Sequence, residues 1–227
     1  GVFAITKIIV YVFGIEFLFD SPSSGWLLYI AVFTILAASL VALRQTNIKR
    51  LLAYSTIAQL SYVVMAAAIL KPLAEVGAAI HIVAHAFGKI TLFFAAGAIY
   101  VASKKTEINQ LKGIGRRMPW TMTAFTIGAL SMIGVPPTAG FVSKWYILAG
   151  AFEAENLVAV FTIIASTVLN AAYFLPILYM AWFAREESGG PEHGEAPFAA
   201  VFALTVTAVL TLAFFLFNGP VIELESQ

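Results

Sequence analysis

The chain contains no cysteine, which excludes disulfide bonds, thiolate metal sites and cysteine nucleophiles. Charged residues are also scarce: they make up 11% of the 227 residues, against 61% hydrophobic residues, and the mean hydropathy is +0.91. This balance excludes a soluble domain and is typical of an integral membrane protein. A net charge of +1 argues against a nucleic-acid partner, which would require a concentrated basic face. We therefore expect the lipid bilayer, and no nucleic acid, as a partner.

Long apolar runs predict membrane-spanning helices, because a span needs about 20 mostly apolar residues. Six runs are long enough, at residues 26–43, 51–70, 75–102, 120–150, 157–183 and 198–217. An opening run at 2–19, interrupted by Lys7 and Glu16, predicts a seventh helix. The sequence thus predicts an all-α, polytopic membrane helix bundle with about seven transmembrane helices. Residues 1–227 are expected to form a single transmembrane domain, with soluble-looking connections only at 103–119 and 184–197.

Basic residues are concentrated in alternate loops of this bundle. Those on one side are Arg44, Lys49, Arg50, Lys104, Lys105, Lys112, Arg116 and Arg117. The positive-inside rule assigns that side to the cytoplasm. Counting the predicted spans places the acidic connection at 184–197 on the same side as the basic loops. The same count places the C-terminal tail on the outer side. We expect a multi-pass protein of the cell (inner) membrane with cytoplasmic loops at 103–119 and 184–197.

A row of ionisable residues lies within one predicted span. His81, His85 and Lys89 are four residues apart, so they stay on one helix face while climbing about 12 Å. Imidazole titrates near pH 6.5 and passes protons between its two nitrogens, and desolvation favours the neutral form of an amine. Histidines that only join neighbouring helices are the alternative. Because intramembrane charge usually serves function, we interpret the row as a proton path whose side chains face the helix bearing Lys144.

Two adjacent prolines interrupt the run at 120–150. Pro136 and Pro137 offer no N–H group and their rings clash with carbonyls one turn earlier, so the helix is expected to unwind over 134–138. Non-helical backbone at membrane depth persists only where protein or a water-filled cavity satisfies it, so the break predicts a hydrated site. The residues assigned to the broken helix are Gly134, Pro136, Pro137 and Gly140.

Lys144 follows this break inside the apolar stretch. A charge costs roughly 2.5 to 3.5 kcal/mol at a helix centre. Ion sites of transporters lie at the ends of broken helices. We interpret Lys144 as a proton-carrying residue; the alternative is a steric kink with the lysine reaching to an interface.

Polar residues on two further spans are weaker candidates for lining the path, because such residues more often join helices by hydrogen bonds. They are Ser55, Gln59 and Tyr62 in one span and Thr162, Ser166, Thr167 and Asn170 in the other. Three glycines, Gly77, Gly88 and Gly97, are expected to allow close helix packing. The sequence shows no phosphate loop, nucleophile triad or metal cluster, and we expect no cofactor and no metal site.

Four segments in order resemble the antiporter-like subunits shared by Mrp-type cation/proton antiporters and respiratory complex I. The segments are NIKRLLAYSTIAQLSYV, HIVAHAFGKITLFFAAGAI, LKGIGRRMPW and SMIGVPPTAGFVSKWYIL. The resemblance runs from residue 1 to about 183 and is nearest to the D-type member of the Mrp antiporter. It implies about fourteen helices in the whole protein, with two five-helix units related by inverted symmetry and one broken helix in each.

The resemblance implies that this chain is the C-terminal half of such a fold. Lys144 then matches the lysine at the end of the family's proton path, and His81, His85 and Lys89 match the residues that link the two units. A glutamate and two lysines of the first unit are expected upstream of Gly1, where the apolar pattern is already under way without the charged start of a signal peptide.

The resemblance also implies transport by a multisubunit assembly with other membrane subunits as partners. The first expectation is exchange of Na⁺ or another cation for H⁺; the alternative is a proton-pumping subunit of a complex I-like NADH:quinone oxidoreductase or a membrane hydrogenase. A chain with no transport of its own is a third possibility. No carboxylate lies deep in a predicted span and Na⁺ prefers oxygen ligands, so we expect this half to move protons. A catalytic role as an enzyme is not expected.

Overall fold

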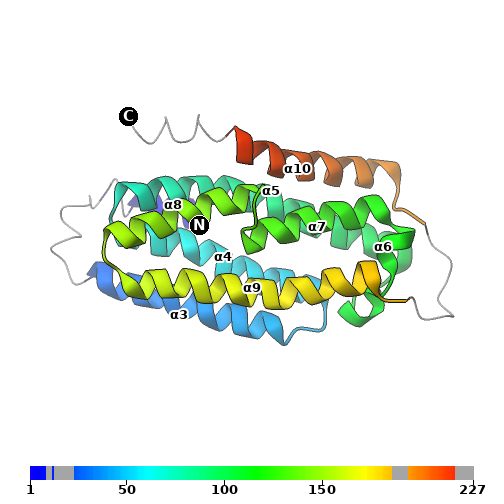
Figure 1. Ribbon diagram of the computed structural model, residues 1–227, viewed down its shortest axis with the longest axis horizontal. Coiled ribbons are helices and arrows are strands. Elements are labelled where there is room, and N and C mark those ends of the chain that lie inside the picture. Colours follow the sequence, from blue (N-terminus) through cyan, green and yellow to red (C-terminus); the bar gives the residue numbers. More distant parts are fainter. Residues whose placement is uncertain (9–11, 13–22, 186–193, 218–227) are drawn as a thin grey trace.

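The computed structural model describes residues 1–8, 12, 23–185 and 194–217, and its regular elements there are helices (Figure 1). Five helices are long and apolar enough to cross a membrane. They are α3 (Ser23–Leu43), α4 (Ile48–Ile69), α5 (Pro72–Ser103), α9 (Leu157–Phe183) and α10 (Phe198–Leu216). Two further helices, α7 (Pro119–Ile133) and α8 (Ala139–Glu153), lie end to end beside them.

The six spans predicted in the interior of the chain are confirmed. The run predicted at 120–150 is the pair α7 and α8, each of 15 residues and therefore too short to cross a membrane alone. The predicted break over 134–138 falls between them. Of the predicted opening helix at 2–19, α1 (Val2–Lys7) is seen, and most of the remainder, including Glu16, lies outside the described residues.

Local sequence sets where several helices begin. The side-chain oxygen of Asn47 accepts hydrogen bonds from two amides in the first turn of α4, and that of Asn156 accepts one in the first turn of α9. These bonds satisfy amides that have no partner within the helix. Pro72 and Pro119 stand in the first turns of α5 and α7, where the missing N–H of proline carries no penalty.

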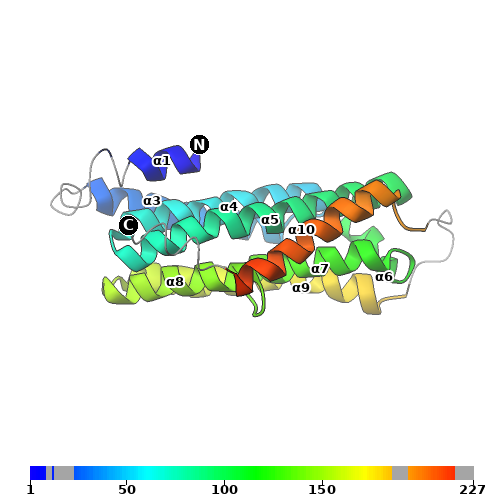
Figure 2. The ribbon, with the colours of Figure 1, turned by 90° about the horizontal axis from the view of Figure 1, so that it is seen from above.

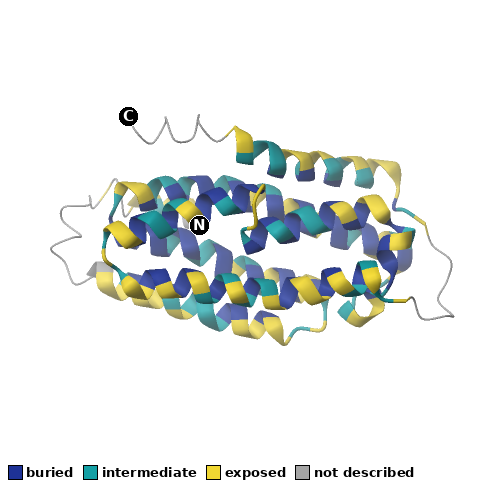
Figure 3. Cartoon of the chain, viewed as in Figure 1, coloured by how far each residue is buried: buried dark blue, intermediate teal, exposed yellow. Residues whose placement is uncertain are grey.

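The two larger apolar cores occupy the two ends of the bundle. The first contains Leu92, Phe125 and Phe174 and the second contains Ile35 and Ile147, all fully or nearly fully buried. The inward faces of the helices are accordingly buried while their outer faces are exposed (Figure 3). Between the cores each of α4, α5, α8 and α9 contributes polar side chains, which we call the polar layer. Its members are Ser55, Gln59, His81, His85, Lys89, Lys144, Ser166 and Asn170.

The connection at 103–119 is packed against the bundle. It contains the short helices η2 (Ile108–Leu111) and α6 (Ile114–Arg117), and Leu111 and Ile114 are fully buried. The amide of Ile48 donates to the carbonyl of Thr106 at 3.0 Å, which ties this connection to the start of α4. Two of the basic loops therefore lie at the same end of the bundle.

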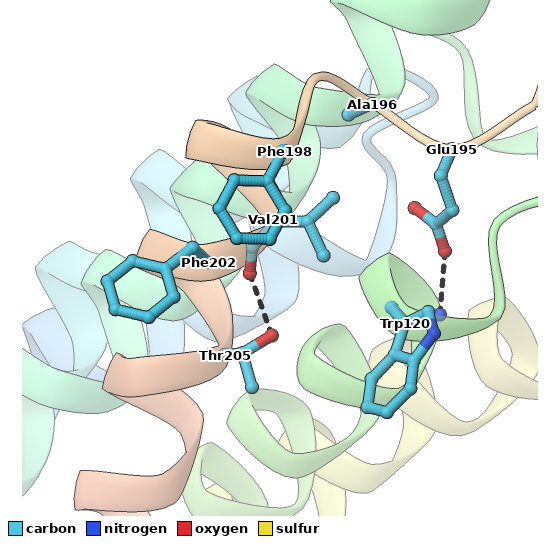
Figure 4. Close-up of a pocket in the computed structure, with 7 residues that line it drawn as sticks. All are labelled: Trp120, Glu195, Ala196, Phe198, Val201, Phe202 and Thr205. Atoms are coloured by element: carbon cyan, nitrogen blue, oxygen red, sulfur yellow. Dashed lines mark hydrogen bonds between the residues drawn. The ribbon is translucent and has the colours of Figure 1, made fainter.

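Helix α10 lies on the outside of the bundle. Seen from above, it crosses α5, α7 and α8 obliquely (Figure 2). A groove of about 450 Å³ lies between its first turns and the start of α7. There the Glu195 carboxylate accepts a hydrogen bond from the Trp120 amide at 2.7 Å (Figure 4). It also accepts one from the Thr121 amide at 3.2 Å. The other residues that line the groove are mainly apolar, and the groove lies apart from the polar layer.

Two of the three glycines singled out from the sequence permit close packing. An added Cβ at Gly77 would lie 2.7 Å from Ile147, and one at Gly88 would lie 2.5 Å from Met132. The expectation is wrong for Gly97, where an added Cβ meets nothing within 4 Å. At these positions, close approach is therefore found between the start and the middle of α5, where Gly77 packs against α8 and Gly88 against the end of α7.

Candidate proton-transfer site

The amine of Lys144 sits on the end of the helix that precedes it. Lys144 is 6% exposed, and its Nζ donates to the carbonyls of Met132 and Ile133, both at 2.9 Å, with Thr167 Oγ1 at 3.5 Å. These carbonyls lack intrahelical partners because α7 ends at Gly134. The C-terminal end of a helix also carries partial negative charge, which favours a cation. The break thus forms a binding position for the lysine.

Glycines bring the two half-helices into contact. Gly134 ends α7 with a φ of +91°, and an added Cβ there would lie 2.9 Å from Cδ of Lys144. The amide of Gly140 donates to Ser131 Oγ at 3.2 Å, and an added Cβ at Gly140 would lie 1.8 Å from the Ser131 carbonyl oxygen. No side chain fits at Gly140 unless the helices move apart.

The two prolines of the break are on the outer surface. Pro136 and Pro137 are both exposed, and the peptide bond between them is cis. Since neither proline has an N–H group, α7 cannot continue through them. Their side chains carry no hydrogen-bonding group and so make no hydrogen bond to Lys144. The prolines act by ending α7, which leaves the carbonyls of Met132 and Ile133 available to accept from Lys144.

The two histidines lie in the polar layer beside this lysine. His81 Nδ1 is 2.8 Å from the hydroxyl of Ser143, the residue before Lys144 on α8. The His81 ring centroid is 5.6 Å from that of Tyr62 and 6.1 Å from that of His85. Lys144 Nζ is 5.2 Å from the centre of the Tyr62 ring. A series of rings therefore runs from Lys144 toward the middle of α5.

Lys89 points to a different helix from the one expected. It is 5% exposed, and its Nζ donates to the Leu52 carbonyl at 3.1 Å and to Ser55 Oγ at 2.8 Å, both on α4. The expectation that the row faces the predicted helix at 120–150 is met by His81, whose Nδ1 contacts Ser143. The Lys89 amine turns to α4 instead. At this level α5 packs against α7, since an added Cβ at the neighbouring Gly88 would lie 2.5 Å from Met132, and α8 begins only at Ala139.

Hydrogen bonds nevertheless join Lys89 to Lys144. Ser55 Oγ, which accepts from Lys89, is 3.0 Å from the Tyr173 hydroxyl, and this hydroxyl is also hydrogen bonded to Asn170 Oδ1. Asn170 Nδ2 donates at 3.3 Å to the Met132 carbonyl, the same oxygen that binds Lys144. The order of this chain is Lys89, Ser55, Tyr173, Asn170, Met132 and Lys144. It passes through α4, α9 and α7.

Four of the weaker candidates named from the sequence belong to this layer, Ser55, Gln59, Ser166 and Asn170, and two more, Tyr62 and Thr167, lie beside Lys144. Gln59 Nε2 donates to the Met132 carbonyl at 3.2 Å, and Gln59, Tyr62 and Asn170 are fully buried. Several buried polar atoms have no hydrogen-bond partner within the described residues: Gln59 Oε1, Tyr62 Oη, His81 Nε2, His85 Nε2 and Ser166 Oγ. Buried polar atoms in native proteins are normally paired with protein or water, so this layer is suited to hold water.

Sequence reasoning missed two members of the site, Tyr173 and Ser143. A helical spacing signal was present for Tyr173, because Ser166, Asn170 and Tyr173 fall on one face of α9. Ser143 adjoins Lys144 and gave no separate signal. Within the part of the chain that the structure describes, no group of three or more His, Cys, Asp or Glu residues could hold a metal ion. The chemistry of this site is that of amines, imidazoles and hydroxyls.

Comparison with known proteins agrees with this architecture. The profile of a family described as "NADH:quinone oxidoreductase/Mrp antiporter, TM" matches residues 1–170. The chain belongs to this family. The resemblance drawn from the four sequence segments is thereby confirmed. Together with its five membrane-crossing helices and the broken pair, membership makes it a multi-pass membrane protein.

Relatives in sequence carry names of oxidoreductase subunits. The chain is 36% identical over 215 residues to NADH-quinone oxidoreductase subunit N of Desulforudis audaxviator, covering 89% of this chain and 43% of the relative. It is 32% identical to F(420)H(2) dehydrogenase subunit N of Methanosarcina mazei, covering 87% of this chain and 42% of the relative. The chain thus spans less than half the length of these relatives.

Solved structures share the fold. A chain of the Mrp complex from Dietzia sp. superposes with a TM-score of 0.87 at 21% identity, covering 99% of this chain and 49% of the other. A chain of an archaeal membrane-bound sulfane sulfur reductase gives 0.85 at 28% identity, covering 99% and 45%. Both belong to multisubunit membrane complexes. The expected fold, about half of an antiporter-like subunit, is confirmed.

Proposed function

We propose that this chain forms a proton-transfer half-path of an antiporter-like membrane subunit. Lys144, His81, His85 and Lys89 are the groups that hold and pass the proton. The observation that supports this most is that two amines, each less than 10% exposed inside an apolar bundle, lie in one layer with the buried rings of His81 and His85. The Nε2 atoms of both histidines have no hydrogen-bond partner within the described residues. Packing alone favours apolar residues at such positions, because burying a charge costs free energy.

The path follows from the neighbours of each group. The Lys144 amine donates to the two carbonyls at the end of α7. One ring, that of Tyr62, separates it from His81, and His85 follows beyond His81. Transfer runs along His81, His85, Lys89, intervening water and Lys144, with Ser55, Gln59, Tyr62 and Asn170 lining the way. Each protonation disfavours a second positive charge nearby through like-charge repulsion, which drives the proton onward.

Two kinds of assembly suit this half-path, each with other membrane subunits as partners. One is an antiporter that exchanges H⁺ for Na⁺ or another cation, favoured by the resemblance of LKGIGRRMPW and VPPTAGFVSKW to the D-type member of the Mrp antiporter. The other is a redox-driven proton pump, favoured by the names of the sequence relatives. Flux that requires an electron donor supports the pump, and flux driven by a Na⁺ gradient alone supports the antiporter.

The placement of carboxylates supports proton movement through this half in either assembly. In the described helices, the acidic residues of α5 and α8 are Glu75, in a first turn, and Glu153, a last residue. An oxygen-rich cation site built on carboxylates therefore has no place in the polar layer. We assign cation binding, where it occurs, to another part of the assembly.

The decisive test is Lys144→Ala in the complete complex. Proton flux into inverted membrane vesicles is measured alongside the abundance of the assembled complex, and we expect flux to fall to near background at unchanged abundance. Near-normal flux at normal abundance would refute the proposal. Reconstitution of the purified complex into liposomes tests whether the chain is purely structural. A complex without transport gives the same proton flux as empty liposomes.

We also propose that the basic loops, with 103–119 and 184–197, face the cytoplasm and that the C-terminal tail lies outside. The charge distribution supports this, as does the meeting of these connections at one end of the bundle. These 227 residues contain no cysteine, so a single cysteine introduced among them is the labelled position within this segment. On intact cells, a membrane-impermeant maleimide should label Glu155→Cys and spare Arg116→Cys until the membrane is permeabilised. The reverse labelling contradicts the assignment.

A further inference from the structure

The Tyr173 hydroxyl lies between two hydrogen-bond acceptors in the polar layer. Tyr173 is 4% exposed; its oxygen is 3.0 Å from Ser55 Oγ and is also hydrogen bonded to Asn170 Oδ1. A phenol carries a single hydrogen, so it donates to one of these oxygens at a time. The direction of donation is therefore set by the hydrogens of the neighbouring groups.

Those hydrogens depend on the proton of Lys89. An ammonium group only donates, so charged Lys89 gives a hydrogen to Ser55 Oγ, 2.8 Å away. The hydroxyl hydrogen of Ser55 is then free to point at Tyr173, and Tyr173 donates to Asn170 Oδ1. When Lys89 loses its proton, its nitrogen gains a lone pair and can accept from Ser55. Tyr173 can then donate to Ser55 Oγ, and Asn170 Oδ1 loses this donor.

The change reaches Lys144 through one carbonyl. Asn170 Nδ2 donates to the Met132 carbonyl at 3.3 Å, and Lys144 and Gln59 donate to the same oxygen at 2.9 and 3.2 Å. A carbonyl oxygen has two lone pairs, so these donors compete. Hydrogen bonds in a chain polarise one another, so donation from Tyr173 makes the Asn170 amide a stronger competitor.

We propose that Tyr173 is a positioning residue whose hydroxyl switches between Asn170 and Ser55 with the charge of Lys89 and so couples the two lysines. Charged Lys89 weakens the hydrogen bond from the Lys144 ammonium to the Met132 carbonyl and so promotes release of the Lys144 proton. Neutral Lys89 strengthens that hydrogen bond. By linkage, the charge of Lys144 acts on Lys89 to the same extent. The inference rests on the proposed proton path. It states how the protonation of Lys89 and the protonation of Lys144 depend on each other.

The test reads the tyrosine hydroxyl directly. Infrared difference spectra are recorded between acidic and alkaline pH on the purified complex containing ring-labelled tyrosine, since the phenol C–O vibration depends on the acceptor. We expect a tyrosine band that is absent in Tyr173→Phe and in Lys89→Met. The band should remain in Tyr179→Phe, a matched change on the exposed face of the same helix. Proton flux should fall about fivefold or more in Tyr173→Phe and stay normal in Tyr179→Phe.

Each outcome decides between roles. A band that persists in Lys89→Met, or flux that is normal in Tyr173→Phe, overturns the switch. If Tyr173→Phe lowers the abundance of the complex, Ser55→Ala removes the same link with a smaller change and must abolish the band. The spectra do not depend on transport, so normal flux in Lys144→Ala would refute the proton path while leaving the switch to be judged by the band alone.

Discussion

The polar layer and helix α10 show two ways in which polar side chains are accommodated in an apolar bundle. In α10, Thr205, Thr207 and Thr211 donate to carbonyls of their own helix, and only 17% of its span is buried. In the polar layer, Lys89, Lys144 and Asn170 donate to atoms on other helices. A threonine bonded within its helix is compatible with lipid at any position, whereas a bond between helices fixes their arrangement.

The buried fraction of each helix also differs between α10 and the helices of the polar layer. Of the span in α5, 56% is buried, and its polar row faces the inside of the bundle. Charge within the membrane is tolerated only where partners are arranged around it. We therefore expect substitutions of buried ionisable residues in the polar layer to reduce transport. Substitutions in α10 should leave transport unchanged. The predictions below test this division.

Lys144→Arg should have the largest effect. Arginine keeps the positive charge and the ability to donate to the carbonyls of Met132 and Ile133, but guanidinium does not release its proton in the working range. We expect flux near background with the complex still assembled, measured in inverted vesicles. Lys49→Arg, on an exposed residue, is the control and should be silent. Substantial flux in Lys144→Arg would mean that the residue provides charge and not a transferable proton.

His85→Gln should lower flux by about a hundredfold, the typical contribution of a positioned acid–base group. Glutamine retains hydrogen-bonding capacity but does not titrate in this range. If His85 only joins helices, the loss should be on the order of 1 kcal/mol in stability with flux nearly normal. Flux and thermal denaturation of the complex, measured on the same preparation, separate these outcomes.

Gly140→Ala should act on stability first. The added carbon would lie 1.8 Å from the Ser131 carbonyl oxygen, so the two half-helices must separate. Overpacking of this kind costs about 1 to 3 kcal/mol or more, and we expect several-fold lower abundance of the complex. Gly97→Ala places the same methyl group where nothing lies within 4 Å and should leave abundance unchanged. Equal abundance of the two variants would show that the contact at the break is relaxed in the membrane.

Thr207→Val should have the smallest effect. Thr207 accepts a hydrogen bond from Thr91 at 2.8 Å and donates to its own helix, so the change removes one bond between α5 and α10. Such bonds contribute about 0.6 kcal/mol on average in membranes. Flux should be normal and the denaturation temperature almost unchanged. A large loss of flux in Thr207→Val would place α10 within the path and end the distinction between the two regions.

Much of this architecture was predictable, because apolar runs and prolines act locally. The spans at 26–43 and 157–183 follow from length and composition, and the break follows from Pro136 and Pro137 whatever surrounds them. The family was also recognisable from four motifs in order. The row His81, His85 and Lys89 was found from its period, since a helix places residues four apart on one face.

The partners of these residues were not predictable. Lys89 bonds to Ser55 on α4, and this depends on how α5 packs against α4 and the broken pair. The spacing of Tyr173 put it on the polar face of α9, but only the fold placed its hydroxyl between Ser55 and Asn170. These contacts join residues more than 100 positions apart in the case of Ser55 and Tyr173, and no local pattern encodes such a distance.

The sequence by itself determined that this protein crosses a membrane, where its helices run, where one of them breaks and which ionisable groups it buries. Each of these depends on the transfer of local groups out of water or on the stereochemistry of neighbouring residues. Only the tertiary structure decided that the freed carbonyls of Met132 and Ile133 bind Lys144 and that a chain of hydrogen bonds links Lys144 to Lys89. Hydrogen bonds act over about 3 Å, so their partners are settled only when the helices have packed.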